Sequence, residues 1–156
     1  MKVCADTSFI VKLLTPEPGA GAAVDLYRRL GRPRLPYTQI HRMEVESAIS
    51  QKAFNARRQG GRRSDIFREK ETALDRLNRW LQVALLVETE VEWGVCFEHA
   101  LRTLPDHSEK LGCRTIDLVH VAIAGWLRVD RFITCDERQA KAARAEGLKT
   151  ELVRFA

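Results

Sequence analysis

The chain has 156 residues, 45% of them apolar, which is the usual size of one domain and supplies enough apolar side chains for a buried core. A count of 26 Lys and Arg against 21 Asp and Glu leaves a formal charge of +5, which suits a polyanionic partner. The four cysteines form no C-x-x-C pair and no apolar run reaches membrane-spanning length, so we expect a soluble, cytoplasmic, single domain over residues 1–156, with no zinc finger and no membrane partner.

The N-terminal part predicts the order strand, helix, helix, strand. The apolar run at 3–5 ends at the helix-capping residues Asp6-Thr7-Ser8, after which helical apolar spacing runs to Leu14. A second helix is predicted over 20–30, and a short strand over 35–37.

A helical hairpin is predicted over about residues 40–80. Helix-forming residues run without Gly or Pro from Thr38 to Gly60-Gly61, and a second helix begins at about Ser64 and leads into a β-like run at 83–87. The tip of this hairpin carries Arg57, Arg58, Arg62 and Arg63.

The C-terminal part returns to alternating elements. We expect a helix over 90–104 closed by Pro105, a buried helix over 117–127, a strand over 131–135, a helix over 137–146 and a last strand near 151–155. This alternation predicts an α/β fold with a mainly parallel central sheet of four to five strands covered by helices. Ligands bind beyond the carboxyl ends of such strands, where Asp6 and Asp136 lie.

Four acidic residues are candidates for one site, although each has an ordinary structural explanation. Asp6, Asp117 and Asp136 all stand where an aspartate can simply cap a helix. Glu44 is flanked one turn away by apolar Ile40 and Ala48, so it is expected to point inward, where a carboxylate must be paired or bind a cation. If the four meet, a hard cation such as Mg²⁺ or Mn²⁺ would relieve their repulsion.

For several other side chains an ordinary structural role competes with a functional one. His120 is expected to be a satisfied core histidine, and Trp80, Trp93 and Trp126 are expected to be core residues. The arginines of the hairpin tip can form a solvated loop, contact RNA or contact an acidic partner protein, and the sequence does not choose among these.

The segments ADTSFIVKLL, the helix with Glu44, TIDLVHVAIA and FITCDERQAKAA, in this order, resemble a PIN-domain ribonuclease, with the VapC-like toxin branch the best match. The resemblance implies a metal-dependent endoribonuclease that uses Mg²⁺ or Mn²⁺. It implies Asp6, Glu44, Asp117 and Asp136 as catalytic metal ligands, with Thr7, Ser8 and Thr134 in support. It further implies a homodimer and a cognate antitoxin protein that blocks the acidic pocket.

Other functions remain open from the sequence. A PIN nuclease of RNA processing or decay, without an antitoxin, would carry the same four segments, and a non-catalytic module that binds RNA or protein would keep the fold. DNA is an alternative substrate because metal-bound carboxylates treat both backbones alike. A phosphatase that uses Asp6 as nucleophile is disfavoured because Ser8 stands where a D-x-D motif needs its second aspartate.

Overall fold

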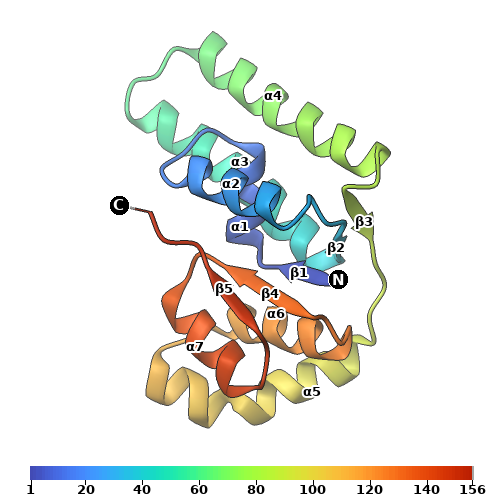
Figure 1. Ribbon diagram of the computed structural model, residues 1–156. Coiled ribbons are helices and arrows are strands. Elements are labelled where there is room, and N and C mark those ends of the chain that lie inside the picture. The colour runs from blue at the N-terminus through green and yellow to red at the C-terminus, as the bar shows by residue number, and fades with distance from the viewer. Residues whose placement is uncertain (156) are drawn as a thin grey trace.

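A computed structural model describes residues 1–155 as five short strands that lie between two groups of helices (Figure 1). Helices α1 to α4 cover one side of the strands, and α5 to α7 cover the other. The strands are β1 (Val3–Ala5), β2 (Leu35–Tyr37), β3 (Leu86–Glu88), β4 (Arg131–Thr134) and β5 (Thr150–Leu152). The helices are α1 (Thr7–Leu14), α2 (Ala20–Arg29), α3 (Gln39–Arg58), α4 (Arg63–Gln82), α5 (Trp93–Leu104), α6 (Thr115–Trp126) and α7 (Glu137–Ala145), with a π-helical segment η1 (Pro105–Glu109) after α5.

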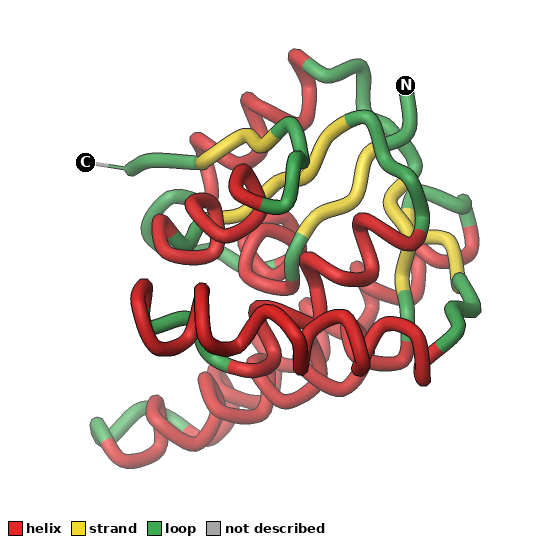
Figure 2. Tube along the Cα trace, turned by 90° about the horizontal axis from the view of Figure 1, so that it is seen from below, coloured by secondary structure: helices red, strands yellow, loops and turns green. Residues whose placement is uncertain are grey.

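The expected α/β fold with parallel strands is confirmed, although the five strands form two ladders rather than one central sheet of four to five strands. One has the order β1-β4-β5, and the other pairs β2 with β3; all pairs are parallel. Figure 2 shows the three-stranded ladder at the centre of the molecule. Strand β2 lies beside β1 but does not pair with it. The carbonyl of Ala5 instead faces the His41 ring, with its oxygen 2.9 Å from Nε2, so this bond replaces a strand-to-strand one.

The central strands are buried on both faces, and alternate residues serve different cores. Val3 and Ala5 of β1 pack into the cluster made with α1 to α4, while Cys4 packs into the cluster made with α6 and α7. Phe132 and Ile133 of β4 divide in the same way. Successive side chains of a strand point to opposite faces, which explains why these runs are apolar throughout rather than alternating.

The helical hairpin of α3 and α4 forms as expected, and it extends away from the strands (Figure 1). Its inner contacts are apolar, from Val45 and Ile49 on α3 to Ala73 and Leu77 on α4. Strand β3 begins at Leu86, later than expected, because α4 continues to Gln82 and Ala84 then adopts a left-handed φ of 53°.

The expected end of the helix before Pro105 is confirmed, and one expectation about the tryptophans is wrong. As expected, α5 ends at Leu104 and Pro105 follows it as the C-cap, although the Pro105 φ of −60° fits a helix and the chain continues directly into η1. Proline lacks the N–H that an α-helical hydrogen bond needs, which agrees with the end of the α-helix at this position. Trp126 is 42% exposed at the end of α6 and is not a core residue, whereas Trp80 and Trp93 are partly buried against the two larger cores.

No helix in the described part of the chain is both long enough and apolar enough to span a membrane.

Candidate active site

A hollow of about 480 Å³ opens at the carboxyl ends of β1 and β4. The two strands are in register there, with Ala5 opposite Ile133, so the residues that follow them emerge side by side. Helices α1, α3 and α6 supply the other walls. The lining residues that carry charge or a polar group are Asp6, Thr7, Ser8, Lys12, Glu17, Glu44, Lys52, Arg114, Asp117, His120 and Asp136.

All four candidate acids line this hollow, and Thr7 and Ser8 line it with them. Thr134 is fully buried behind it and contacts two of the acids, since its hydroxyl donates to the Asp6 carboxylate at 2.8 Å and accepts from the Asp136 amide at 2.9 Å. The four arginines of the hairpin tip are exposed and lie outside the hollow.

Asp6 stands directly after β1, and the residue is 5% exposed. It caps α1 by accepting from the Phe9 amide at 2.9 Å, and it also accepts from the hydroxyls of Ser8 and Thr134. Burial raises the pKa of Asp6 above its usual value, although these hydrogen bonds and the nearby His120 oppose the shift. The buried surroundings of Asp6 therefore disfavour the ionised form of its carboxylate.

Asp136 caps α7 from the end of β4. Its carboxylate accepts from the amides of Arg138 at 2.7 Å and Gln139 at 3.1 Å. Burial raises the pKa of Asp136, but these amide bonds and the Arg138 side chain outweigh it and lower the pKa overall. Asp136 is thus a helix cap and a wall of the hollow at once.

Asp117 lies in the first turn of α6 and is 7% exposed. Its carboxylate accepts from the backbone amide of Arg114 at 3.0 Å, which closes the start of the helix. The side-chain amide of Gln139 donates to the Asp117 carbonyl at 3.0 Å, so α7 fixes the position of this turn.

Glu44 faces inward from α3, as the spacing of its apolar neighbours predicted. One oxygen of its carboxylate accepts from the Thr7 hydroxyl at 2.7 Å and from Nε2 of His120 at 2.5 Å. Burial raises the pKa of Glu44, and these two bonds outweigh it and lower the pKa overall. Three elements, α1, α3 and α6, therefore converge on one carboxylate.

His120 is buried, but it is not the satisfied core histidine that the sequence predicted. Its Nε2 lies at the hollow, on Glu44, and its Nδ1 has no hydrogen-bond partner among the described residues. The apolar spacing of α6 placed this residue in the core correctly, but spacing does not reveal that the ring edge reaches a carboxylate on another helix.

His41 ties α3 to β1 behind the hollow. Because Nε2 donates to the Ala5 carbonyl, Nδ1 must accept, and Thr38 donates to it at 2.8 Å. Burial and the neighbouring His120 ring, 4.6 Å away between centroids, lower the pKa of His41 to about 3. His41 is thus a neutral link that sets the distance between the Asp6 turn and the Glu44 helix.

Two lysines of the hollow were not anticipated from the sequence. Lys12 on α1 and Lys52 on α3 both donate to Glu17, with Lys12 at 2.8 Å from Oε1. Burial raises the pKa of Glu17, but the two lysines outweigh it and lower the pKa overall. The sequence did contain a signal for Lys52. Glu44, Ala48 and Lys52 are spaced four residues apart, which places Lys52 on the same face of the helix as Glu44.

The donor chemistry of the hollow fits a hard divalent cation, because buried carboxylate oxygens are the ligands that Mg²⁺ and Mn²⁺ prefer. A cation would also offset the charge of Asp6, whose burial disfavours ionisation. Within residues 1–155, however, no three acidic, imidazole or thiol side chains are grouped closely enough to hold an ion together. Each carboxylate bonds to donors of the protein instead.

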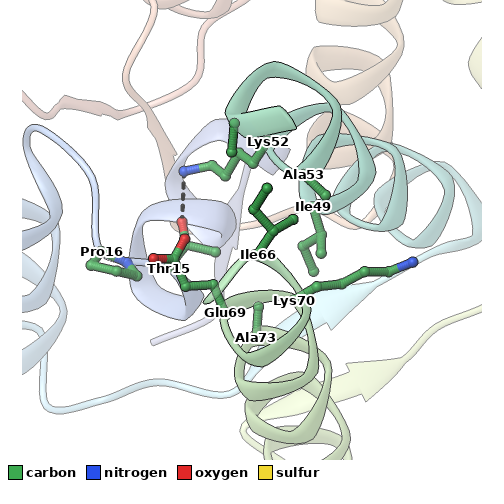
Figure 3. A pocket seen from close by; sticks show the side chains of 10 residues that line it. Thr15, Pro16, Ile49, Lys52, Ala53, Ile66, Glu69, Lys70 and Ala73 are labelled. Carbon is green, nitrogen blue, oxygen red and sulfur yellow. Dashed lines mark hydrogen bonds between the residues drawn. The ribbon is translucent and has the colours of Figure 1, made fainter. Parts of the chain in front are cut away.

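A second cavity, of about 60 Å³, lies between the two helices of the hairpin (Figure 3). Small and apolar side chains of the two helices line it together with Thr15, Lys52, Glu69 and Lys70, and its volume is that of a packing gap.

The chain matches the family model of the PIN domain over residues 3–145. No curated protein sequence matches the chain.

Proposed function

Because the chain belongs to the PIN domain family, whose members are generally metal-dependent nucleases, we propose that it is a metal-dependent endoribonuclease whose active site is the acidic hollow. The observation that carries this proposal is that Asp6, Glu44, Asp117 and Asp136, from four separate segments, line one hollow at the carboxyl ends of two parallel strands.

In this proposal the four carboxylates hold Mg²⁺ or Mn²⁺. The bound ion would lower the pKa of a water and offset charge on the scissile phosphate. Thr7 and His120 hold the carboxylate of Glu44, and Ser8 and Thr134 hold that of Asp6, so the acids are oriented before an ion arrives. Arg114, which lines the hollow, would contact a phosphate oxygen of the substrate.

The finer assignment rests on the likeness to the VapC-like branch. We propose that the chain is the toxin of a toxin–antitoxin pair, that it acts as a homodimer and that an antitoxin covers the hollow. We also propose that the hairpin-tip arginines, all exposed, contact RNA or that antitoxin. Induced expression should arrest growth with the native chain and not with Asp117→Asn, and light scattering should give twice the monomer mass.

The nuclease itself is tested with a labelled single-stranded RNA. We expect cleavage with Mg²⁺ or Mn²⁺, none with a chelator, and a loss of at least about 100-fold in Asp6→Asn and in Asp117→Asn, which remove metal-binding charge. The matched control is Asp75→Asn, an exposed aspartate of α4 outside the hollow, which should retain full activity. Cleavage that persists in both site variants, or in chelator, would refute the proposal; cleavage of DNA alone would replace its substrate.

A further inference from the structure

The hollow has a basic end as well as an acidic one. Lys12 and Lys52 approach the same carboxylate, that of Glu17, from two different helices. Two cations against one anion leave an excess of one positive charge at this point. Lys52 also donates to the Thr15 hydroxyl at 3.0 Å, and Figure 3 shows its side chain directed toward that residue.

Helices α1 and α3 run side by side in the same direction along the hollow. Thr7 contacts Glu44 at one end and Thr15 contacts Lys52 at the other, and both pairs are 37 residues apart in sequence. An equal offset at both ends of two neighbouring helices requires that they be parallel over this stretch.

On both helices the side chains at the hollow are therefore acidic toward the N-terminal end and basic toward the C-terminal end. On α3, Glu44 and Lys52 are eight residues apart on one face, which is roughly 12 Å along the helix axis. On α1, Asp6 caps the first turn and Lys12 follows in the last. A polyanion that lies along the two helices would meet the acids first and the lysines next.

An aromatic ring lies at the basic end. Phe155 lines the hollow, is 44% exposed, and lies 4.7 Å from the Lys12 ammonium, measured to the ring centroid. The ring is also in close contact with Gly19, where a Cβ atom would come within 2.4 Å of it. The glycine thus lets the ring sit at the edge of the hollow.

We propose that Lys12, Lys52 and Phe155 form a binding subsite for single-stranded RNA next to the cleavage position. The lysines bind phosphates that adjoin the scissile one, and Phe155 receives an unpaired base. The subsite rests on the proposed nuclease function, since it assigns how that substrate is held.

Physical chemistry favours this occupant. Single-stranded nucleic acid is bound by a cationic groove that follows the backbone together with aromatic rings on which bases stack, and both features meet here. The lysines also resolve a difficulty of the nuclease proposal, because an acidic hollow on its own repels an RNA backbone. Glu17 limits the motion of both ammonium groups, so less side-chain entropy is lost when a phosphate binds.

The lysines are tested by RNA binding in the Asp117→Asn background, where the RNA stays intact. Fluorescence anisotropy with a labelled single-stranded RNA should show weaker binding in Lys12→Gln/Lys52→Gln, and the slope of log K against log salt should fall by about 0.7 for each lysine. The control is Lys110→Gln/Lys141→Gln, two exposed lysines outside the hollow with the same change of net charge.

Phe155 is tested by the same measurement. Phe155→Ala should weaken binding roughly ten-fold with no change in salt slope, and Phe155→Trp should restore it, because stacking depends on the ring and not on charge. Phe97→Ala on α5 is the matched control, since that ring is 48% exposed and lies outside the hollow.

The outcomes separate the subsite from the nuclease. If RNA binding depends on the lysines and on Phe155 but the native chain cleaves no RNA, the subsite is supported and the nuclease proposal is overturned. Cleavage and binding that are unaffected in folded lysine and Phe155 variants would overturn the subsite and leave the nuclease standing. In that second case the lysines would be free to bind an acidic protein segment.

Discussion

Asp6 illustrates how one residue can serve a site at the expense of stability. Its pKa is raised because burial disfavours the charge, so the ionised carboxylate is less stable in the folded chain than it would be in water. Asparagine keeps the oxygen that caps α1 and removes the charge.

We therefore expect Asp6→Asn to abolish cleavage and yet to be more stable than the native chain. A gain of about 1 kcal/mol is typical when a destabilised functional group is replaced, and for a chain of this size it corresponds to roughly 2–4 °C in Tm. Thermal unfolding at neutral pH measures it.

The pH dependence of this gain gives the control. An acid with a raised folded pKa binds more protons when folded, so its penalty disappears as pH falls through that pKa. The difference in Tm between Asp6→Asn and the native chain should shrink toward acid pH. A difference that stays constant or grows would show that burial of the Asp6 charge is not its cause.

Asp136 separates a capping role from a chemical one. Alanine at this position removes the acceptor for the Arg138 and Gln139 amides and should cost about 1 kcal/mol, whereas asparagine keeps an acceptor and should cost only a few tenths. Both variants should lose cleavage if the carboxylate holds a metal. Full activity in Asp136→Asn would leave Asp136 as a helix cap only.

At the scale of elements, the hairpin depends on its turn. Gly61 follows α3, and a Cβ atom there would lie 2.9 Å from the Ala56 carbonyl oxygen and 3.3 Å from Cδ1 of Ile66. Neither neighbour can give way easily, since one is backbone and the other packs between the helices.

We expect Gly61→Ala to destabilise the chain by about 1 kcal/mol or more, because the turn must shift to relieve the contact. The matched change is Gly21→Ala, inside α2 with open space around it, which should stabilise by about 0.5–1 kcal/mol through helix propensity. Urea unfolding of both variants measures the difference. Equal effects in the two would argue against the close approach at the tip.

For the whole molecule, the proposed ion should link the two groups of helices. The acids belong to α3 on one side of the strands, to α6 on the other, and to the segments that follow β1 and β4. An ion that binds only the folded state stabilises it by about 2.7 kcal/mol at a concentration of 100 times its Kd.

Mn²⁺ or Mg²⁺ should therefore raise the Tm of the native chain and not that of Asp6→Asn or Asp117→Asn, and a chelator should reverse the shift. The experiment reads metal binding without any substrate. A shift of equal size in the site variants would place the ion elsewhere.

The sequence alone determined the alternation of strands and helices, the parallel direction of the strands and the hairpin, because these follow from local apolar periodicity, capping residues and glycines. It also selected the four acids as candidates, from their places at strand ends and on an inward helix face. Only the tertiary structure decided that Ala5 bonds to His41 rather than to β2, that His120 reaches Glu44, and that Lys12 and Lys52 meet at Glu17. These contacts join residues between 5 and 76 positions apart in the sequence. Most of them connect different elements, and the distance between two elements is set by packing rather than by any local pattern in the chain.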